Sequence, residues 1–236
     1  MRIHTTLLRT AIVLCLVLAM GQSIFAQQGR TVERYRTIAA EYSVLDLEYN
    51  IFNPTSETIT SVGVGLSGLR FWNDGDFGLH SGIGFRVPQE RTVVSSTGAT
   101  TTSNYNDYDM AFMVDMFVGL GFRNRISDAT TVYIAGDIYG LGFGQATSTF
   151  DGSSTVERTL VEAFGGYQAE LGLFHALRGP RILRLSVAAT YLPSYSYTYE
   201  EQNSAGTFST TGDFAPPEFE GFNYRISVGI GNYFRY

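Results

Sequence analysis

The chain has 236 residues, of which 14% are aromatic, with 26 glycines, six prolines and a formal net charge of −6. All sixteen basic side chains are arginines, and they form no cluster along the sequence. An acidic chain without basic clusters is unsuited to nucleic acid, so we expect none as a partner. The one cysteine, Cys15, lies in the N-terminal segment, which leaves the rest of the chain without disulfides.

Residues 1–26 have the pattern of a secretory signal peptide. Arg2 and Arg9 precede an apolar run over residues 11–20, and small or polar residues then lead to Ala26, after which we expect cleavage. The run is too short for a membrane helix, which needs about 20 residues. No later run is long and apolar enough either, so the remaining chain could cross a membrane only as a closed β-barrel.

Eight later segments alternate apolar and polar side chains, which is the period-two pattern of a β-strand. In chain order they span residues 45–51, 62–72, 77–87, 110–122, 132–143, 161–173, 183–199 and 220–236. Irregular alternation predicts bulges near Gly68 and Gly140. Pro193 has no N–H to donate to a neighbouring strand, and it therefore predicts a bulge or the point where its strand leaves the membrane.

The last segment shows the alternation most clearly. Its even positions from Phe222 to Tyr236 are apolar or aromatic apart from Asn232, whereas its odd positions are mostly small or charged and include Arg225 and Arg235. One face of this strand is therefore apolar, and Tyr236 lies on that face.

The connectors between the predicted strands fall into two classes that alternate along the chain. Residues 73–76, 124–130 and 177–181 are short and rich in turn formers, whereas residues 95–107, 148–158 and 200–217 are long and polar, and 53–58 is the shortest of this second set. Short turns on one rim and long loops on the other are typical of outer-membrane barrels, whose long loops lie outside the cell. Residues 27–40 are then expected to be a periplasmic lead-in and residues 41–236 the barrel.

Alternation alone also permits a soluble barrel with its apolar face inward. Two features favour an apolar exterior. Aromatic residues gather at the strand ends on the apolar face, as in the girdles at the membrane interfaces; the expected girdle is Trp72, Phe77, Phe122, Tyr191, Tyr195, Tyr197, Phe222, Phe234 and Tyr236. Charges of both signs on the polar face predict a lumen packed with ion pairs; the expected network is Asp46, Glu48, Arg70, Arg86, Asp109, Asp115, Arg123, Asp137, Glu162, Glu170, Arg184 and Arg225.

The alternation, the loop asymmetry and a terminal strand that ends on an aromatic residue resemble the small eight-stranded outer-membrane barrels, such as outer-membrane protein X, the OmpA membrane domain and OmpW. The resemblance implies an all-β, eight-stranded antiparallel up-and-down transmembrane β-barrel in the bacterial outer membrane, surrounded by outer-membrane lipid. It also implies that the barrel assembly machinery reads the terminal strand, with Tyr236, as an insertion signal. OmpW-like proteins conduct small apolar molecules through an apolar lumen, whereas this lumen is expected to be charged at mid-barrel, with Phe117, Phe164 and Leu192 as its large apolar residues.

Sequence motifs that would indicate a catalytic, metal or cofactor site are weak. The segment from Gly63 to Gly68 has the letters of a dinucleotide fingerprint, but that motif requires a strand turning into a helix, and here the strand pattern continues. His80 and His175 have no partner at metal-ligand spacing. We therefore expect no catalytic residues, no metal and no cofactor.

The expected function is a non-enzymatic structural or surface-interaction role. It would act on an extracellular ligand through the long loops and through a β rim that carries Tyr195, Tyr197 and Tyr199. Two alternatives stay open: a narrow OmpW-like pore for small solutes, and a lipid A-modifying enzyme, whose histidine would act near the outer rim, whereas His80 and His175 are expected near short turns.

Overall fold

The computed structural model describes residues 31–50, 54–72, 74–150, 155–203 and 206–236. Within these ranges the chain forms ten strands and one short 3-10 helix. They are β1 (Val32–Tyr49), β2 (Thr55–Trp72), β3 (Phe77–Val94), β4 (Thr100–Asn104), η2 (Tyr105–Asp107), β5 (Met110–Arg125), β6 (Thr130–Phe150), β7 (Thr155–Ala176), β8 (Arg181–Asn203), β9 (Gly206–Phe214) and β10 (Phe219–Arg235). No helix in the described part of the chain is long and apolar enough to span a membrane. The expected signal peptide, residues 1–26, lies outside the described residues and stays a prediction.

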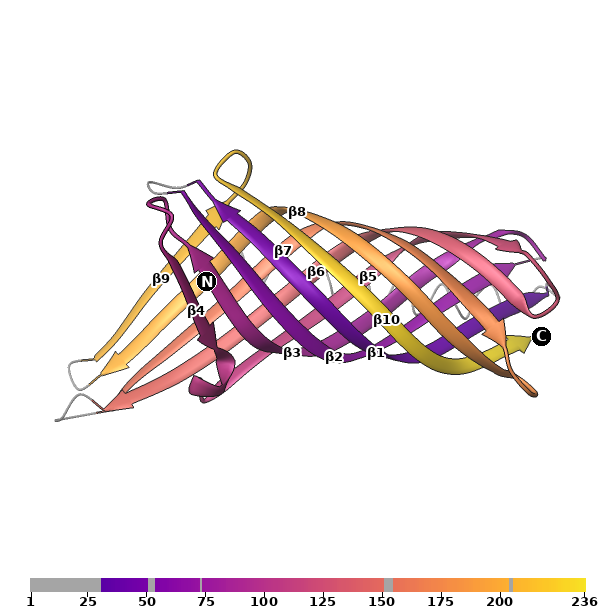
Figure 1. Cartoon of the computed structure of the whole chain (residues 1–236), viewed down its shortest axis with the longest axis horizontal. Helices are drawn as coiled ribbons and strands as arrows, with labels where there is room; N and C mark the ends of the chain where they lie inside the picture. The colour runs from indigo at the N-terminus through magenta and orange to yellow at the C-terminus, as the bar shows by residue number, and fades with distance from the viewer. Residues whose placement is uncertain (1–30, 51–53, 73, 151–154, 204–205) are drawn as a thin grey trace.

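Eight of these strands close into a barrel (Figure 1). Wall strands pair in the order β10-β1-β2-β3-β5-β6-β7-β8, and β8 pairs again with β10. β4 and β9 lie off this ring and pair with the parts of β3 and β8 farthest from the short turns. Each wall strand therefore has partners on both edges, as a sheet within lipid requires. The expected eight-stranded antiparallel barrel is confirmed.

The first wall strand begins earlier than expected. β1 starts at Val32 and pairs with β10 from Glu33 opposite Arg235 onward. Residues 32–40, which were expected in the periplasmic lead-in, therefore belong to the barrel wall. Arg34 and Arg36 on the outer face of β1 obscured the alternation that marks it as a strand.

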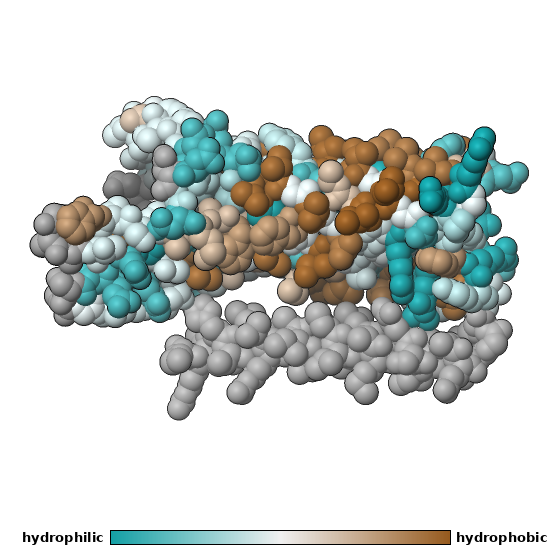
Figure 2. Space-filling model, turned by 90° about the horizontal axis from the view of Figure 1, so that it is seen from below, coloured by the Kyte–Doolittle hydropathy of each residue, from teal (hydrophilic) through white to brown (hydrophobic). Residues whose placement is uncertain are grey.

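The barrel is apolar outside and charged inside. Large apolar side chains on the wall strands are about half exposed, among them Ile38, Leu66, Ile138 and Ile230, and Figure 2 shows a hydrophobic belt beside hydrophilic ends. The largest fully buried side chains include Arg86, Arg123 and Arg184. A water-soluble domain has the reverse arrangement, so the apolar belt faces lipid.

Several strands are longer than a membrane crossing requires. A tilted strand crosses in about 9–11 residues, whereas β6, β7 and β8 have 21, 22 and 23. The surplus of these strands, together with β4 and β9, projects from the end opposite the short turns, on the left in Figure 1. We call this part the projecting sheet. Because outer-membrane barrels keep their short turns on the periplasmic side, the projecting sheet is extracellular.

The register confirms one predicted bulge and contradicts two. Gly165 pairs with Ser194 and Tyr167 with Tyr191, so Leu192 and Pro193 together oppose one residue of β7 and form a bulge at the expected proline. The bulges expected near Gly68 and Gly140 were wrong, because pairing is continuous there. The alternation is irregular at these places because Leu69 and Leu141 are apolar residues that point into the lumen.

Candidate functional site: the lumen and its extracellular mouth

A connected set of ionisable side chains fills the middle of the lumen. We call it the mid-lumen network: Glu41, His80, Arg86, Asp115, Asp137, Glu170, Arg184 and Arg225. Each lies at a strand position whose neighbours on either side face lipid, so the alternation of the wall directs it inward. Buried charges are tolerated only when they are paired, and the members of this set contact one another extensively.

Arg225 on β10 is the centre of the mid-lumen network. Its Nη2 atom donates to Gln168 Oε1 at 3.1 Å and to Glu170 Oε2 at 3.2 Å. Its Nη1 lies 3.6 Å from Asp115 Oδ1, and its Nε lies 3.9 Å from Glu41 Oε1. One guanidinium therefore links side chains from β1, β5, β7 and β10.

Two further arginines extend the mid-lumen network around the wall. Arg86 pairs with Asp115 and donates to Ser43 Oγ at 2.6 Å and Tyr139 Oη at 2.9 Å. Arg184 pairs with Glu170 and donates to Tyr133 Oη at 2.8 Å.

His80 belongs to the same network. Its Nδ1 lies 2.9 Å from Asp137 Oδ2, which also accepts a hydrogen bond from Gln168 Nε2 at 3.0 Å. Both His80 and Asp137 are buried. His175, in contrast, is exposed near the β5–β6 turn, with Nδ1 3.0 Å from Thr130 Oγ1.

The mid-lumen network joins walls that face each other. β10 and β5 stand opposite in the ring, and the Arg225–Asp115 pair connects them. Asn223 on β10 similarly donates to Tyr139 Oη on β6 at 3.1 Å. Side chains that meet across a barrel occupy its bore, as expected for eight strands.

A second charged layer lies toward the short turns. Glu33 on β1 accepts hydrogen bonds from Arg125 Nη2 at 2.6 and 2.7 Å and pairs with Arg123. Arg123 lies over the Phe71 ring, 4.2 Å from its centroid. Stacked rings separate this layer from the network above it, with Phe174 between Tyr35 and Tyr133.

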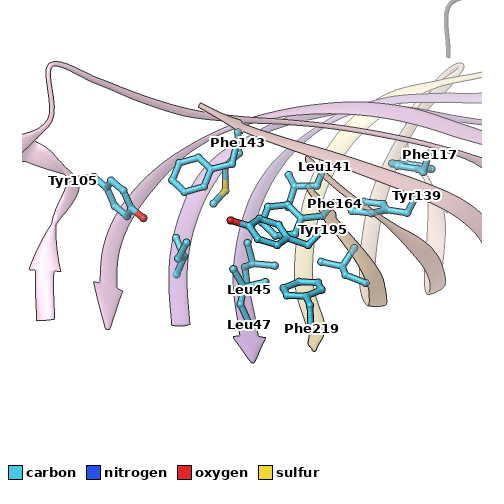
Figure 3. Packing of buried hydrophobic residues seen from close by; sticks show 13 residues of the cluster. Leu45, Leu47, Tyr105, Phe117, Tyr139, Leu141, Phe143, Phe164, Tyr195 and Phe219 are labelled. Atoms are coloured by element: carbon cyan, nitrogen blue, oxygen red, sulfur yellow. The ribbon is translucent and has the colours of Figure 1, made fainter. Parts of the chain in front are cut away.

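A large apolar cluster fills much of the extracellular half of the lumen, which the sequence did not lead us to expect. Thirteen buried residues form this luminal cluster: Leu45, Leu47, Ile59, Tyr105, Met113, Phe117, Tyr139, Leu141, Phe143, Phe164, Leu192, Tyr195 and Phe219 (Figure 3). Phe117, Phe164 and Leu192 were expected to point inward, and they do. The leucines of β1 had been assigned to the lipid face because the inner face of each strand was inferred from its polar residues, here Asp46 and Glu48.

Eight of the twelve residues expected in the ionic lumen are buried inside the barrel: Arg86, Asp115, Arg123, Asp137, Glu162, Glu170, Arg184 and Arg225. Six of them belong to the mid-lumen network. Arg123 lies in the layer near the short turns, and Glu162 lies near the extracellular end, where it accepts a hydrogen bond from Tyr195 Oη at 2.9 Å.

The other four expected residues are not in the lumen. Asp46 and Glu48 lie on the outer face of β1, because the true alternation of that strand turns Leu45 and Leu47 inward. Asp109 is exposed before the start of β5. Arg70 is buried but lies on the outer face of β2 by the alternation of that strand, over the Trp72 ring at 5.4 Å. Sequence reasoning missed Glu33 and Glu41. Glu41 lies between the outward residues Ala40 and Tyr42, which is a signal that the alternation offered, whereas Glu33 lies in the segment expected to be the lead-in.

Seven of the nine expected girdle residues lie on the outer face: Trp72, Phe77, Phe122, Tyr191, Phe222, Phe234 and Tyr236. Tyr195 and Tyr197 were assigned to the wrong face. The bulge at Pro193 shifts the alternation of β8 by one residue, so Tyr195 packs in the luminal cluster and Tyr197 packs against it. The exposed tyrosines expected on the β rim are therefore at least half-buried side chains on the inner side of the projecting sheet.

A cavity of about 190 Å³ lies on that inner side, at the mouth of the lumen. Its lining includes Arg91, Tyr108, Gln145, Arg158 and Tyr199. Arg91 Nε lies 2.7 Å from Glu57 Oε1, and Arg158 Nε donates to Glu201 Oε2 at 3.0 Å. Gln145 is 6% exposed, and its Oε1 has no hydrogen-bond partner among the described residues. The cavity therefore offers an unused acceptor beside two guanidinium groups.

Comparison with known proteins supports the fold. No family model and no curated protein matches the chain. A major outer membrane protein from Thermus thermophilus is similar in structure, with a TM-score of 0.55 at 12% identity, over 83% of this chain and 100% of that chain. OprG from Pseudomonas aeruginosa gives a TM-score of 0.47 at 9% identity, over 86% of this chain and 95% of that one. The outer membrane protease OmpT from Escherichia coli gives 0.41 at 7%, over 86% and 97%.

The first of these likenesses shows a shared fold, whereas the other two are too distant to support an argument. The closed barrel, its lipid-facing belt and this likeness together identify the chain as an integral outer-membrane β-barrel protein.

Proposed function

We propose that this protein is a non-enzymatic barrel, closed to solutes at mid-lumen, that binds a ligand outside the cell on its projecting sheet. The observation that carries the proposal is the contact between opposite walls through Arg225 and Asp115. An open pore of this strand number would need its charged side chains to line a water-filled path rather than pair across it.

The extracellular end supplies the binding groups. The cavity at the lumen mouth combines Arg91, Arg158 and the buried carbonyl of Gln145. Phe150 and Phe208, on β6 and β9 of the projecting sheet, are 73% and 62% exposed. Exposed aromatic rings beside polar groups suit recognition of a partner, because rings bury a large area with little loss of side-chain entropy.

Two experiments test the two parts of the proposal. In planar bilayers the purified protein should give no steady single-channel steps, and such steps would overturn the closed lumen. Proteoliposomes carrying the protein should bind at least one ligand in panels of immobilised peptides and glycans, and Phe150→Ser with Phe208→Ser should abolish that binding. Leu120→Ser is the control. It removes an exposed apolar side chain from the lipid-facing belt, away from the projecting sheet, and should leave the binding unchanged. Binding that survives the double substitution, or no binding in any panel, would count against a surface role.

A narrow channel for small solutes is the second candidate. The apolar luminal cluster favours it, since an apolar solute could dissolve among those rings. It differs from the first candidate in requiring passage: uptake of a small aromatic solute into proteoliposomes would support the channel, and a signal equal to that of empty liposomes would exclude it.

A lipid A-modifying activity has little support from the histidines. His80 is 1% exposed within the lumen, out of reach of a lipid substrate, and His175 is on the short-turn side. We expect His80→Gln to leave the lipid A mass spectrum of expressing cells unchanged, whereas loss of a modified species would reinstate an enzyme.

A further inference from the structure

The outer face of the barrel carries a group of arginines near the short turns. On β1 and β2, Arg34 lies directly opposite Arg70 in the antiparallel register. One outward position farther along β1, Arg36 lies opposite Asn232 of β10, and Asn232 lies opposite Arg181 of β8. Neighbouring strands are about 4.8 Å apart, so the fold brings Arg34, Arg36, Arg70 and Arg181 into one patch, which we call the arginine patch.

Three of the four patch arginines, Arg34, Arg36 and Arg181, form no ion pair with another described residue. Carboxylates at this end of the barrel pair instead with Arg123, Arg125 and Arg235. The Nε atom of Arg34 is buried and has no hydrogen-bond partner in the described structure.

Aromatic rings position two members of the patch. Arg34 lies over the Tyr236 ring at 5.9 Å, and Arg70 lies over the Trp72 ring at 5.4 Å. Ring contact keeps the Arg34 guanidinium in place but does not neutralise it. Because Arg34, Arg36 and Arg181 bring like charges close together on one face of neighbouring strands, this part of the patch favours a bound anion.

An apolar groove begins where the arginine patch ends. It has a volume of about 250 Å³ and is lined by Ile38, Ala40, Val64, Leu183, Val228 and Ile230 among others. Leu183, Ile230 and Ile38 are the next outward residues after Arg181, Asn232 and Arg36, about 7 Å farther along their strands. The small side chain of Ala40 between larger neighbours hollows the surface. The groove is therefore continuous with the patch and runs into the lipid-facing belt.

We propose that the arginine patch and the groove together bind one anionic glycerophospholipid of the periplasmic leaflet. The guanidinium groups of Arg34, Arg36 and Arg181 hold the phosphate, and one acyl chain lies in the groove over Ala40. The short turns place the patch on the periplasmic side, beside the girdle rings of Trp72 and Tyr236, which mark the level of the lipid headgroups. Arginine is suited to this role because its planar fork matches two phosphate oxygens.

A diffuse attraction to charged headgroups is the simpler explanation for arginines near a membrane surface. It predicts that any exposed arginine at this end contributes equally and that the shape of the groove has no influence. Arg178, in the exposed β7–β8 turn, provides the comparison, since it has the same charge at the same end but lies away from the groove.

The test is native mass spectrometry of the protein released from nanodiscs of mixed phosphatidylglycerol and phosphatidylcholine. The wild-type protein should retain one phosphatidylglycerol in preference to phosphatidylcholine. Arg36→Gln with Arg181→Gln should reduce that preference about tenfold or more, because each arginine near an anionic headgroup contributes on the order of fivefold. Neither side chain has an ion pair within the described protein, so the variant should fold, which a heat-shifted band on electrophoresis checks.

Ala40→Leu tests the groove without changing charge. It should also lower retention of phosphatidylglycerol, whereas Ala189→Leu on the outer face of β8, away from the groove, and Arg178→Gln should leave it unchanged. Equal retention of both lipids by the wild type, or an equal loss in Arg178→Gln, would overturn the proposed site. If Ala40→Leu retained the lipid as well as Ala189→Leu did, the acyl chain would not lie in the groove. Displacement of the lipid by inorganic phosphate alone would also overturn it.

Discussion

Arg225 and Asp115 belong to strands on opposite sides of the barrel, yet Arg225 Nη1 lies 3.6 Å from Asp115 Oδ1. Three wall strands separate β10 from β5 in either direction around the ring. The pair therefore connects opposite walls, and the middle of this barrel is a packed ionic core. A globular domain places aliphatic side chains in that position.

Replacing Arg225 with methionine should destabilise the barrel strongly. The substitution keeps most of the side-chain volume but leaves Glu41 without its nearest cation and removes one partner each from Asp115 and Glu170. Breaking a buried ion pair costs about 3–5 kcal/mol. Urea unfolding from lipid vesicles, followed by Trp72 fluorescence, measures the change in free energy. Arg178→Met in an exposed turn should change it by less than about 0.5 kcal/mol, and equal effects of the two substitutions would contradict a stabilising network.

Removing two luminal guanidiniums together should open a leak. Arg86→Ala with Arg225→Ala deletes the side chains that reach Asp115 from two walls and leaves space for water beside an unpaired carboxylate. We expect small cation-selective currents in planar bilayers that the wild-type protein does not give. Arg158→Ala with Arg178→Ala removes the same charge outside the ionic core and should stay silent. A silent luminal double variant, shown to be folded, would mean that the luminal cluster alone seals the barrel.

The inward position of Tyr195 can be tested by removing one oxygen atom. Tyr195→Phe eliminates the 2.9 Å hydrogen bond to buried Glu162 and should cost about 1–3 kcal/mol. Tyr191→Phe, on the outer face of the same strand, removes a 3.3 Å contact with Glu220 and should cost less than about 1 kcal/mol. Unfolding free energies measured in the same vesicles compare the two. The reverse order would indicate that β8 has no bulge between these tyrosines.

Gly166 should be far more sensitive to substitution than Gly136. A Cβ atom on Gly166 would lie 1.9 Å from the Tyr191 backbone oxygen, beside the bulge at Pro193, whereas a Cβ on Gly136 would meet nothing within 4 Å. Gly166→Ala must therefore displace backbone and is expected to cost about 1–3 kcal/mol. The fraction of heat-shiftable, folded protein after refolding measures the effect. Similar folded fractions for the two alanine variants would argue against close packing of β7 on β8 at this point.

The role of Tyr236 as an assembly signal stays a prediction. Its ring is 71% exposed on the lipid face and stacks on Phe234. Tyr236→Ser should lower the amount of folded protein in the outer membrane of expressing cells but leave refolding into detergent unchanged, because recognition by the assembly machinery is absent in detergent. A loss in both assays would instead indicate a structural role for the ring.

Much of the fold followed from local pattern. The alternation of β10, the short turns and the long polar connectors predicted a closed eight-stranded barrel, and Pro193 predicted the bulge in β8. These features depend on side-chain period and on single residues, both of which can be read in order along a chain. The alternation in β10 also assigned Arg225 to the lumen correctly.

The sequence could not determine which side chains meet across the barrel. Asp46, Glu48 and Arg70 were placed in the lumen because a strand's inner face was inferred from polarity. The inner face of β1 near the extracellular end instead carries Leu45 and Leu47, and that of β2 near the short turns carries Leu69 and Phe71. Tyr195 was put outside for a different reason. The bulge at Pro193 changes the alternation of every later residue in β8.

By itself, the sequence determined the strand period, the turn positions and an exterior suited to lipid, because each depends on residues close together in the chain. Only the tertiary structure decided the partners of Arg225, the apolar luminal cluster and the arginine patch. Barrel closure and strand register set these together, and they bring into contact residues that lie far apart in the sequence.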